Sequence, residues 1–352
     1  MNPKLFKALQ FVFFLLVGLV LLFFAFRGID LDELMLQIVQ ADYRWAAASV
    51  LFAIFALVFR TLRWQLLIEP LDEHPKRINI FRAINVGYLA NFVFPRIGEI
   101  TRCGILNRTD RISVTKLFGT VIVERAFDLL MSALMLILIL LLRFDVVGNF
   151  IMDDILRPAM NRIPGMARLE WIIGIFILLI IAFYVFYRIF KAQLSKISAL
   201  RKIKDLMRGV VKGILSAYRI RNFGWFIVLN FLIFGMYFMQ TYVMFFAFES
   251  TSSLGIGDAL FVLVLSALAI IIPVQGGIGA YHWIVSMGLT IFGLTREEGM
   301  VYAAVTHSVT SITLILMGAI SLFFVFYGKK YRKKEEKVED NSSEDMVQIV
   351  VL

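Results

Sequence analysis

Six apolar segments, each long enough to cross a bilayer as a helix, constrain this chain more than any other feature. A transmembrane helix needs about 20 mostly apolar residues, and 60% of the 352 residues are hydrophobic. The sequence therefore predicts an all-α polytopic membrane protein. The expected spans are Leu9–Phe26, Trp45–Leu67, Leu117–Leu142, Trp171–Phe190, Phe223–Phe248 and Gly299–Tyr327.

Two further apolar segments are too short or too interrupted to be ordinary spans. Residues 78–94 end at Pro95, and residues 259–292 are broken at Pro273. We expect both to form re-entrant helical hairpins, with two thin, tilted spans as the alternative for the second. The expected fold is thus about six full transmembrane helices plus two re-entrant hairpins, in one transmembrane domain that covers residues 1–328.

The distribution of basic residues predicts the orientation. With a cytoplasmic N-terminus, 28 Lys and Arg residues fall on the cytoplasmic side and 7 on the outer side, leaving Arg125 within the membrane. The cytoplasmic count includes Arg60 and Arg63. This asymmetry follows the positive-inside rule, so we expect both termini to be cytoplasmic at the cell (inner) membrane. Because the net charge of +10 mainly sets topology, it gives no reason to expect nucleic-acid binding.

This topology relates the two interrupted segments to each other. They enter the membrane from opposite sides, each is followed by a full span, and Pro95 and Pro273 lie 178 residues apart. Interrupted segments in corresponding places of two halves indicate a transporter-like site at a repeat interface. We therefore expect an inverted repeat, although the two halves show no visible sequence alignment.

Two cytoplasmic segments have compositions of their own. Residues 191–222 combine apolar residues at helical spacing with many basic ones, which predicts an amphipathic helix on the anionic leaflet or a topology-setting linker. The tail, residues 329–352, is charged and poor in aromatic residues, so we expect it to be disordered.

A charge cluster lies inside the apolar segment Leu117–Leu142. A helix that starts near Lys116 places Glu124 roughly 12 Å and Asp128 roughly 18 Å into the membrane, and charges at that depth cost at least about 2.5–3.5 kcal/mol each. Glu124 and Asp128 share a helix face, and Arg125, three residues before Asp128, is their expected partner. The cluster predicts a polar site or pathway in the membrane; the alternative is a structural ion pair that locks two helices.

The residues at the two breaks could bind an anion. Arg96 and Arg102 carry guanidinium groups suited to phosphate, with Glu99 as the expected partner. The alternative is that they are interfacial charges which mark the cytoplasmic side. The second break frees backbone groups that could bind an anionic group beside a helix N-terminus, or it could serve close helix packing. Its candidate residues are Pro273, Gly276, Gly277 and Gly279.

The remaining polar residues give weaker signals. His282 and His307 lie in or near membrane segments, where they could couple proton movement or pack as hydrogen-bonded side chains. No histidine pair has metal-ligand spacing, and the single cysteine, Cys103, excludes an intramolecular disulfide framework. We expect neither a metal nor a cofactor.

Three ordered motifs resemble the flippase-like transmembrane region of lysylphosphatidylglycerol synthases. They are the string Asn91–Arg102, the charged Glu124–Asp128 and the glycine-rich Ile272–Gly279, and the resemblance covers about residues 5–327. It implies a lipid-translocating module with re-entrant helices. In full-length synthases a soluble domain attaches lysine to the lipid; this chain ends soon after its last span, so we expect no enzyme activity of that kind. Many relatives have an acidic residue shortly after the glycine-rich break, where this chain has Tyr281-His282-Trp283.

The sequence leaves three functional classes open. The first is a translocator of a phospholipid or lipid-linked precursor with a polar or anionic headgroup, driven without nucleotide hydrolysis because no GxxxxGK[ST] motif occurs. The second is a transporter of a small soluble anion, and the third a membrane-embedded transferase that acts on a lipid carrier. The expected partners are membrane lipids, anionic ones among them, with a homodimer left open.

Overall fold

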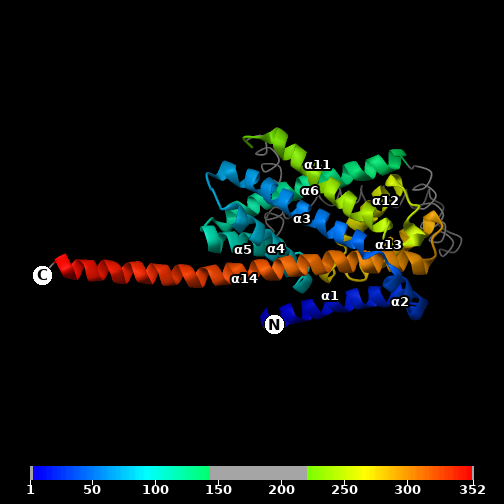
Figure 1. Cartoon of the computed structure of the whole chain (residues 1–352), viewed down its shortest axis with the longest axis horizontal. Helices are drawn as coiled ribbons and strands as arrows, with labels where there is room; N and C mark the ends of the chain where they lie inside the picture. Colours follow the sequence, from blue (N-terminus) through cyan, green and yellow to red (C-terminus); the bar gives the residue numbers. More distant parts are fainter. Residues whose placement is uncertain (1–2, 143–219, 351–352) are drawn as a thin grey trace, which may run out of the picture.

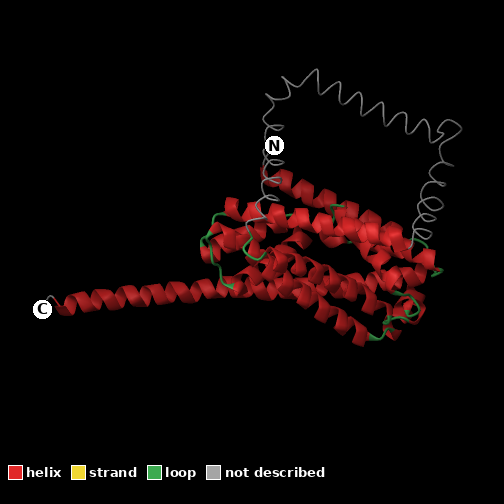
Figure 2. Ribbon diagram, turned by 90° about the horizontal axis from the view of Figure 1, so that it is seen from above, coloured by secondary structure: helices red, strands yellow, loops and turns green. Residues whose placement is uncertain are grey.

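The computed structural model describes residues 3–142 and 220–350, and every regular element within these ranges is helical (Figures 1 and 2). The prediction of an all-α protein is confirmed. The helices are α1 (Pro3–Phe26), α2 (Leu31–Gln40), α3 (Tyr43–Ile68), α4 (Arg77–Val93), α5 (Gly98–Asp110), α6 (Val114–Leu142), α11 (Phe223–Phe245), α12 (Ile256–Ile271), α13 (Ala280–Leu289) and α14 (Arg296–Val350). Short 3-10 turns are η1 (Glu69–Leu71), η4 (Glu249–Thr251), η5 (Gln275–Gly277) and η6 (Thr290–Phe292).

Four of the six predicted spans are helices long and apolar enough to cross a membrane. They are Tyr43–Leu71, Val114–Leu142, Phe223–Phe245 and Arg296–Tyr327. The predicted span Leu9–Phe26 falls within α1, whose described apolar stretch, Leu15–Phe26, is shorter than a span. Trp171–Phe190 lies outside the described residues, as does nearly all of the basic segment 191–222. Four of the six predicted spans are therefore candidate spans by length and composition, and the count of six stays a prediction.

Helices α4 and α5 form a hairpin whose tip is the loop Phe94–Ile97. Proline lacks an N–H and disfavours helical backbone in the residue before it, and α4 accordingly ends at Val93, with Phe94 extended at φ −133° and ψ 127°. The backbone N–H of Gly98, the first residue of α5, donates to Asn91 Oδ1 of α4 at 2.7 Å. The Asn91 side chain of α4 thus accepts a hydrogen bond from an N–H group that would otherwise be unpaired at the start of α5.

Helices α12 and α13 form a second hairpin, whose tip contains η5. Pro273 follows the end of α12, and three glycines carry the chain back through left-handed backbone that other residues rarely adopt. Their φ angles are 58° at Gly276, 80° at Gly277 and 81° at Gly279. The two predicted breaks are therefore the tips of two helical hairpins.

The two hairpins start at opposite ends of the bundle. At the end where α4 begins, which we call the basic end, the Lys76 N–H donates to Asp110 Oδ1 at 3.4 Å. At the other end, the Asp42 N–H donates to the Ala247 carbonyl at 2.9 Å, shortly before α12. The first helix of each hairpin, at 17 and 16 residues, is shorter than the neighbouring spans. Each tip is only partly buried: Gly98 and Val274 are buried, whereas Arg96 and Pro273 are exposed.

Two apolar cores hold the bundle together. One core joins α3, α4, α5, α6 and α11 around buried residues such as Trp64, Leu106 and Phe226. The other core joins α11, α12, α13 and α14 to parts of α1 and α2 around Phe245 and Tyr302. Between them, α3 and α11 carry the polar residues described below.

The last helix differs from what its sequence predicts. Disorder was expected from residue 329 onward, whereas α14 continues as helix to Val350 and projects beyond the bundle in both views (Figures 1 and 2). Lys, Glu and Arg, which are frequent in this stretch, are good helix formers even without a core to pack against.

Candidate functional site

Glu124 is the centre of a buried charge cluster contributed by α3, α5 and α6. Its side chain is 1% exposed, and four guanidinium groups lie within 3.0 Å of its carboxylate. Oε1 accepts from Arg60 Nη2 at 2.7 Å, Arg63 Nη2 at 2.9 Å and Arg125 Nη2 at 3.0 Å. Oε2 lies 2.8 Å from Arg102 Nη1 as an ion pair. A carboxylate buried this deeply is stabilised only by such partners.

Asp128, one turn further along α6, shares three of these arginines. Its Oδ1 accepts from Arg63 Nη1 at 2.7 Å, and its Oδ2 lies 2.9 Å from Arg125 Nη2 and 3.5 Å from Arg60 Nη2. The predicted pairing of Arg125 with Asp128 is confirmed. The buried partners, however, are Arg60 and Arg63 of α3, whereas the Arg125 side chain is 41% exposed.

Polar residues of α11 complete the cluster from its far side. Arg63 Nη1 donates to Asn230 Oδ1 at 2.6 Å, and Arg60 Nη1 donates to the Tyr237 hydroxyl at 2.8 Å. Asn230 is held by its own amide, which donates to the Phe226 carbonyl at 2.7 Å. The cluster therefore ties α3, α6 and α11 together.

Arg102 of α5 is the least satisfied arginine of the cluster. Its guanidinium lies 4.5 Å from the centroid of the Trp64 ring, and its residue is 5% exposed. Its Nε and Nη2 are buried without a hydrogen-bond partner among the described residues. Buried donors of this kind are costly to leave unpaired, so this side chain has unused capacity for an acceptor.

Glu99 does not take the role predicted for it. It was expected to pair with Arg96 or Arg102, but its Oε1 lies 3.9 Å from Arg125 Nη1, and Arg102 pairs with Glu124 instead. The reason is packing between helices: Arg102 is drawn to the buried carboxylate of Glu124 on α6, and Glu99 approaches Arg125 of the same helix. Within the cluster, four arginines face the three carboxylates of Glu99, Glu124 and Asp128, which leaves a formal charge of +1.

The tips of the two hairpins meet. Arg96, with φ 62°, donates from Nη2 to the Ile271 carbonyl at the end of α12 at 2.7 Å. A Cβ added to Gly276 would lie 2.5 Å from the Phe92 ring of α4. Arg96 thus links the two tips, and its role as a phosphate ligand stays a prediction.

The glycine-rich tip also contacts α1 and α14. A Cβ added to Gly279 would lie 2.5 Å from the Gly18 carbonyl of α1, so this glycine permits the close approach. His307 Nε2 of α14 lies 2.8 Å from the Gly276 carbonyl, and the His282 and His307 rings are 4.8 Å apart. His282 is buried and its Nδ1 accepts weakly from the Gly279 N–H at 3.4 Å. Both histidines therefore brace the tip, and the described residues contain no group of side chains that could hold a metal.

A family model described as the lysylphosphatidylglycerol synthase TM region matches residues 11–318. The chain belongs to this family. The resemblance drawn from the three motifs is confirmed, and with it the classification as a multi-pass membrane protein. No curated protein and no solved structure gives a significant match.

In this member of the lysylphosphatidylglycerol synthase TM family, sequence reasoning missed Arg60 and Arg63. Both were counted as cytoplasmic charges, although the predicted span Trp45–Leu67 already contained them. They are three residues apart, which places them on one helix face. Two arginines on the same face of an apolar helix predict that buried carboxylates elsewhere in the chain will pair with them. Glu124 and Asp128 are these carboxylates.

Proposed function

We propose that this chain translocates a phospholipid or lipid-linked precursor with a polar or anionic headgroup. The observation that carries the proposal is Arg102, a buried guanidinium with two unpartnered nitrogens in a cluster of formal charge +1. Arginine binds phosphate through two parallel hydrogen bonds. A phosphate oxygen at Arg102 would satisfy donors that the described protein groups leave unpaired.

The two hairpins support the same proposal. We infer that they are re-entrant, because their helices are shorter than a span, start at opposite ends and meet at their tips. Broken helices in two halves are the arrangement through which transporters expose a site to one side at a time. A lipid headgroup could move past such tips while its acyl chains stay in the bilayer.

Transbilayer movement of fluorescent phospholipids in liposomes that contain the purified protein tests the proposal. Arg102→Gln removes the guanidinium that is expected to hold the phosphate and should slow movement at least about tenfold, the effect of roughly 1.4 kcal/mol. Arg111→Gln, at the exposed C-cap of the same helix, is the matched control and should leave the rate unchanged. Equal rates for both variants, at equal folded yield, would contradict the proposal.

The same cluster would also suit a small soluble anion, so the experiment needs a second arm. Uptake of radiolabelled phosphate into the same liposomes separates the two substrates. Arg102-dependent phosphate uptake without lipid movement would assign the cluster to a soluble anion. Lipid movement without phosphate uptake would support the translocator.

A further inference from the structure

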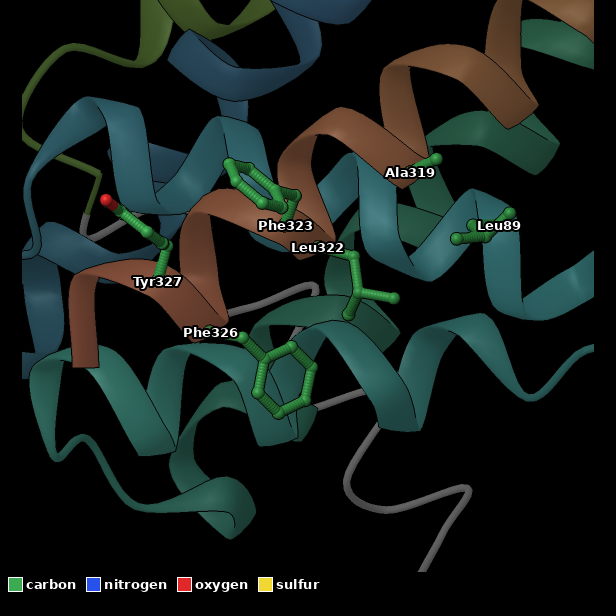
Figure 3. Close-up of a pocket in the computed structure, with 6 residues that line it drawn as sticks. All are labelled: Leu89, Ala319, Leu322, Phe323, Phe326 and Tyr327. Atoms are coloured by element: carbon green, nitrogen blue, oxygen red, sulfur yellow. The ribbon is translucent and has the colours of Figure 1, made fainter. Parts of the chain in front are cut away.

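An apolar groove runs along α14 at its junction with α4, remote in sequence from the charge cluster. Its volume is about 530 Å³, within the range of about 300–1,000 Å³ that is typical of ligand sites. Five of the six lining residues come from α14 and one from α4, and Figure 3 shows them side by side. They are Leu89, Ala319, Leu322, Phe323, Phe326 and Tyr327.

The groove lies beside a tight contact between the two helices. Gly318, directly before Ala319, approaches α4 so closely that a Cβ there would lie 2.6 Å from Leu89 Cβ and 2.8 Å from the Asn85 carbonyl. The rings that follow on the groove face are exposed: Phe323 by 59% and Phe326 by 51%. The surface is therefore open to the bilayer at the end of the span.

A cation with no ion-pair partner among the described residues packs against Phe326, one of the rings that line this groove. The Arg108 guanidinium, at the basic end of α5, lies 4.6 Å from the centroid of the Phe326 ring. No ion pair joins it to a carboxylate in residues 3–142 or 220–350, whereas each arginine of the buried cluster has at least one. An apolar groove with an unneutralised guanidinium at the basic end has the charge and polarity pattern of an anionic amphiphile.

We propose that the groove binds one phospholipid with an anionic headgroup, its acyl chain along Leu89, Ala319 and Leu322 and its phosphate at Arg108. Guanidinium groups bind phosphate oxygens strongly, and basic residues near a membrane surface favour anionic lipids. This site is separate from Arg102 and does not depend on the translocator proposal. It would select lipids by headgroup charge, which ordinary boundary lipid does not.

Arg82 provides a matched control. Its guanidinium lies 5.2 Å from the centroid of the Phe324 ring, also on α14, but Phe324 does not line the groove. Arg82 and Arg108 thus share residue type, ring contact and partner helix, and differ in whether the contacted ring belongs to the groove.

Quenching of a tryptophan reporter tests the site. Phe323→Trp places the reporter in the groove, and the parent protein with its five native tryptophans gives the background. In liposomes of phosphatidylcholine, a small fraction of phosphatidylglycerol brominated in its acyl chains should associate with the reporter about fivefold more than brominated phosphatidylcholine. That ratio corresponds to roughly 1 kcal/mol for one basic side chain at an anionic surface.

The two arginine variants then decide the outcome. Adding Arg108→Gln to the reporter should abolish the preference for the anionic lipid, and adding Arg82→Gln should leave it intact. Equal quenching by the two brominated lipids, or equal loss in both variants, would mean ordinary boundary lipid and overturn the proposal. Absence of quenching by either lipid would also overturn it, because a second copy or another segment of the chain would then cover the groove.

Discussion

Arg63 of α3 and Glu124 of α6 form a fully buried ion pair, with Arg63 Nη2 2.9 Å from Glu124 Oε1 and side chains 0% and 1% exposed. The same guanidinium reaches Asp128 and Asn230 through its other terminal nitrogen. One side chain thus connects three helices. Removing it would leave two carboxylates short of a partner in a region where water cannot replace the lost contacts.

Replacing Arg63 should therefore destabilise the protein more than replacing Arg125. Arg63→Ala leaves buried charge unpaired and should cost about 3–5 kcal/mol. Arg125→Ala should cost less, because the Arg125 side chain is 41% exposed and Glu124 keeps three other arginines. Thermal unfolding in detergent micelles, together with folded yield by gel filtration, measures both.

Arg44→Ala serves as the reference for this series. Arg44 lies in α3 as Arg63 does, but it is exposed and forms no ion pair with a described carboxylate, so its loss should be nearly neutral. If Arg125→Ala unfolded the protein as readily as Arg63→Ala, the assignment of Arg63 as the central buried partner would be wrong.

The sequence predicted the helices well because their signals are local. Apolar length identified the spans, and Pro95 and Pro273 marked the hairpin tips because proline in the interior of a helical pattern kinks or ends the helix. The cluster was predicted only in part. Glu124 and Asp128 stood out against apolar neighbours, whereas Arg60 and Arg63 were counted as cytoplasmic charges although they lie on one face of the predicted span Trp45–Leu67. Their partners are set by packing between helices, which no local pattern encodes.

The α4–α5 hairpin should depend on Gly98 and be indifferent to Gly104, although both lie in α5. A Cβ on Gly98 would collide with the Gly87 carbonyl oxygen and with the Asn91 side chain, whereas a Cβ on Gly104 would meet nothing within 4 Å. Gly98→Ala should thus cost about 1–3 kcal/mol through overpacking. Gly104→Ala should be neutral or stabilise the helix by up to about 1 kcal/mol.

Unfolding midpoints of the two glycine variants in the same detergent check this expectation. Similar midpoints for Gly98→Ala and Gly104→Ala would show that α4 and α5 are not in backbone contact. Loss of stability in Gly104→Ala alone would point to a partner on the outer face of α5.

His307 should act at the second tip through a hydrogen bond that it donates. The Gly276 carbonyl can only accept, so the His307 Nε2 at 2.8 Å must carry the proton. His307→Gln keeps a donor near that position and should retain stability within about 0.5 kcal/mol. His307→Leu leaves the carbonyl unpaired and should cost about 1–3 kcal/mol.

Thermal unfolding of the two His307 variants distinguishes the bond from ring packing. The His307 ring also contacts His282 at 4.8 Å and Tyr281 at 5.1 Å. Equal destabilisation by Gln and Leu would assign the role of His307 to these ring contacts and not to the hydrogen bond.

The contact between the two hairpin tips can be measured by coupling Gly276 to Phe92. Gly276→Ala introduces two costs: an L residue at φ 58°, about 1–2 kcal/mol, and a Cβ 2.5 Å from the Phe92 ring. Gly293→Ala has only the first cost, because Gly293 has φ 83° with nothing within 4 Å. Gly276→Ala should therefore be the more destabilising of the two.

In a double-mutant cycle, Phe92→Ala makes room for the new Cβ of Gly276→Ala. The double variant should therefore be more stable than the sum of the two single effects predicts, by about 0.5–3 kcal/mol. Strict additivity would mean that the tips do not touch in the membrane, and it would remove the main support for the inference that both hairpins are re-entrant.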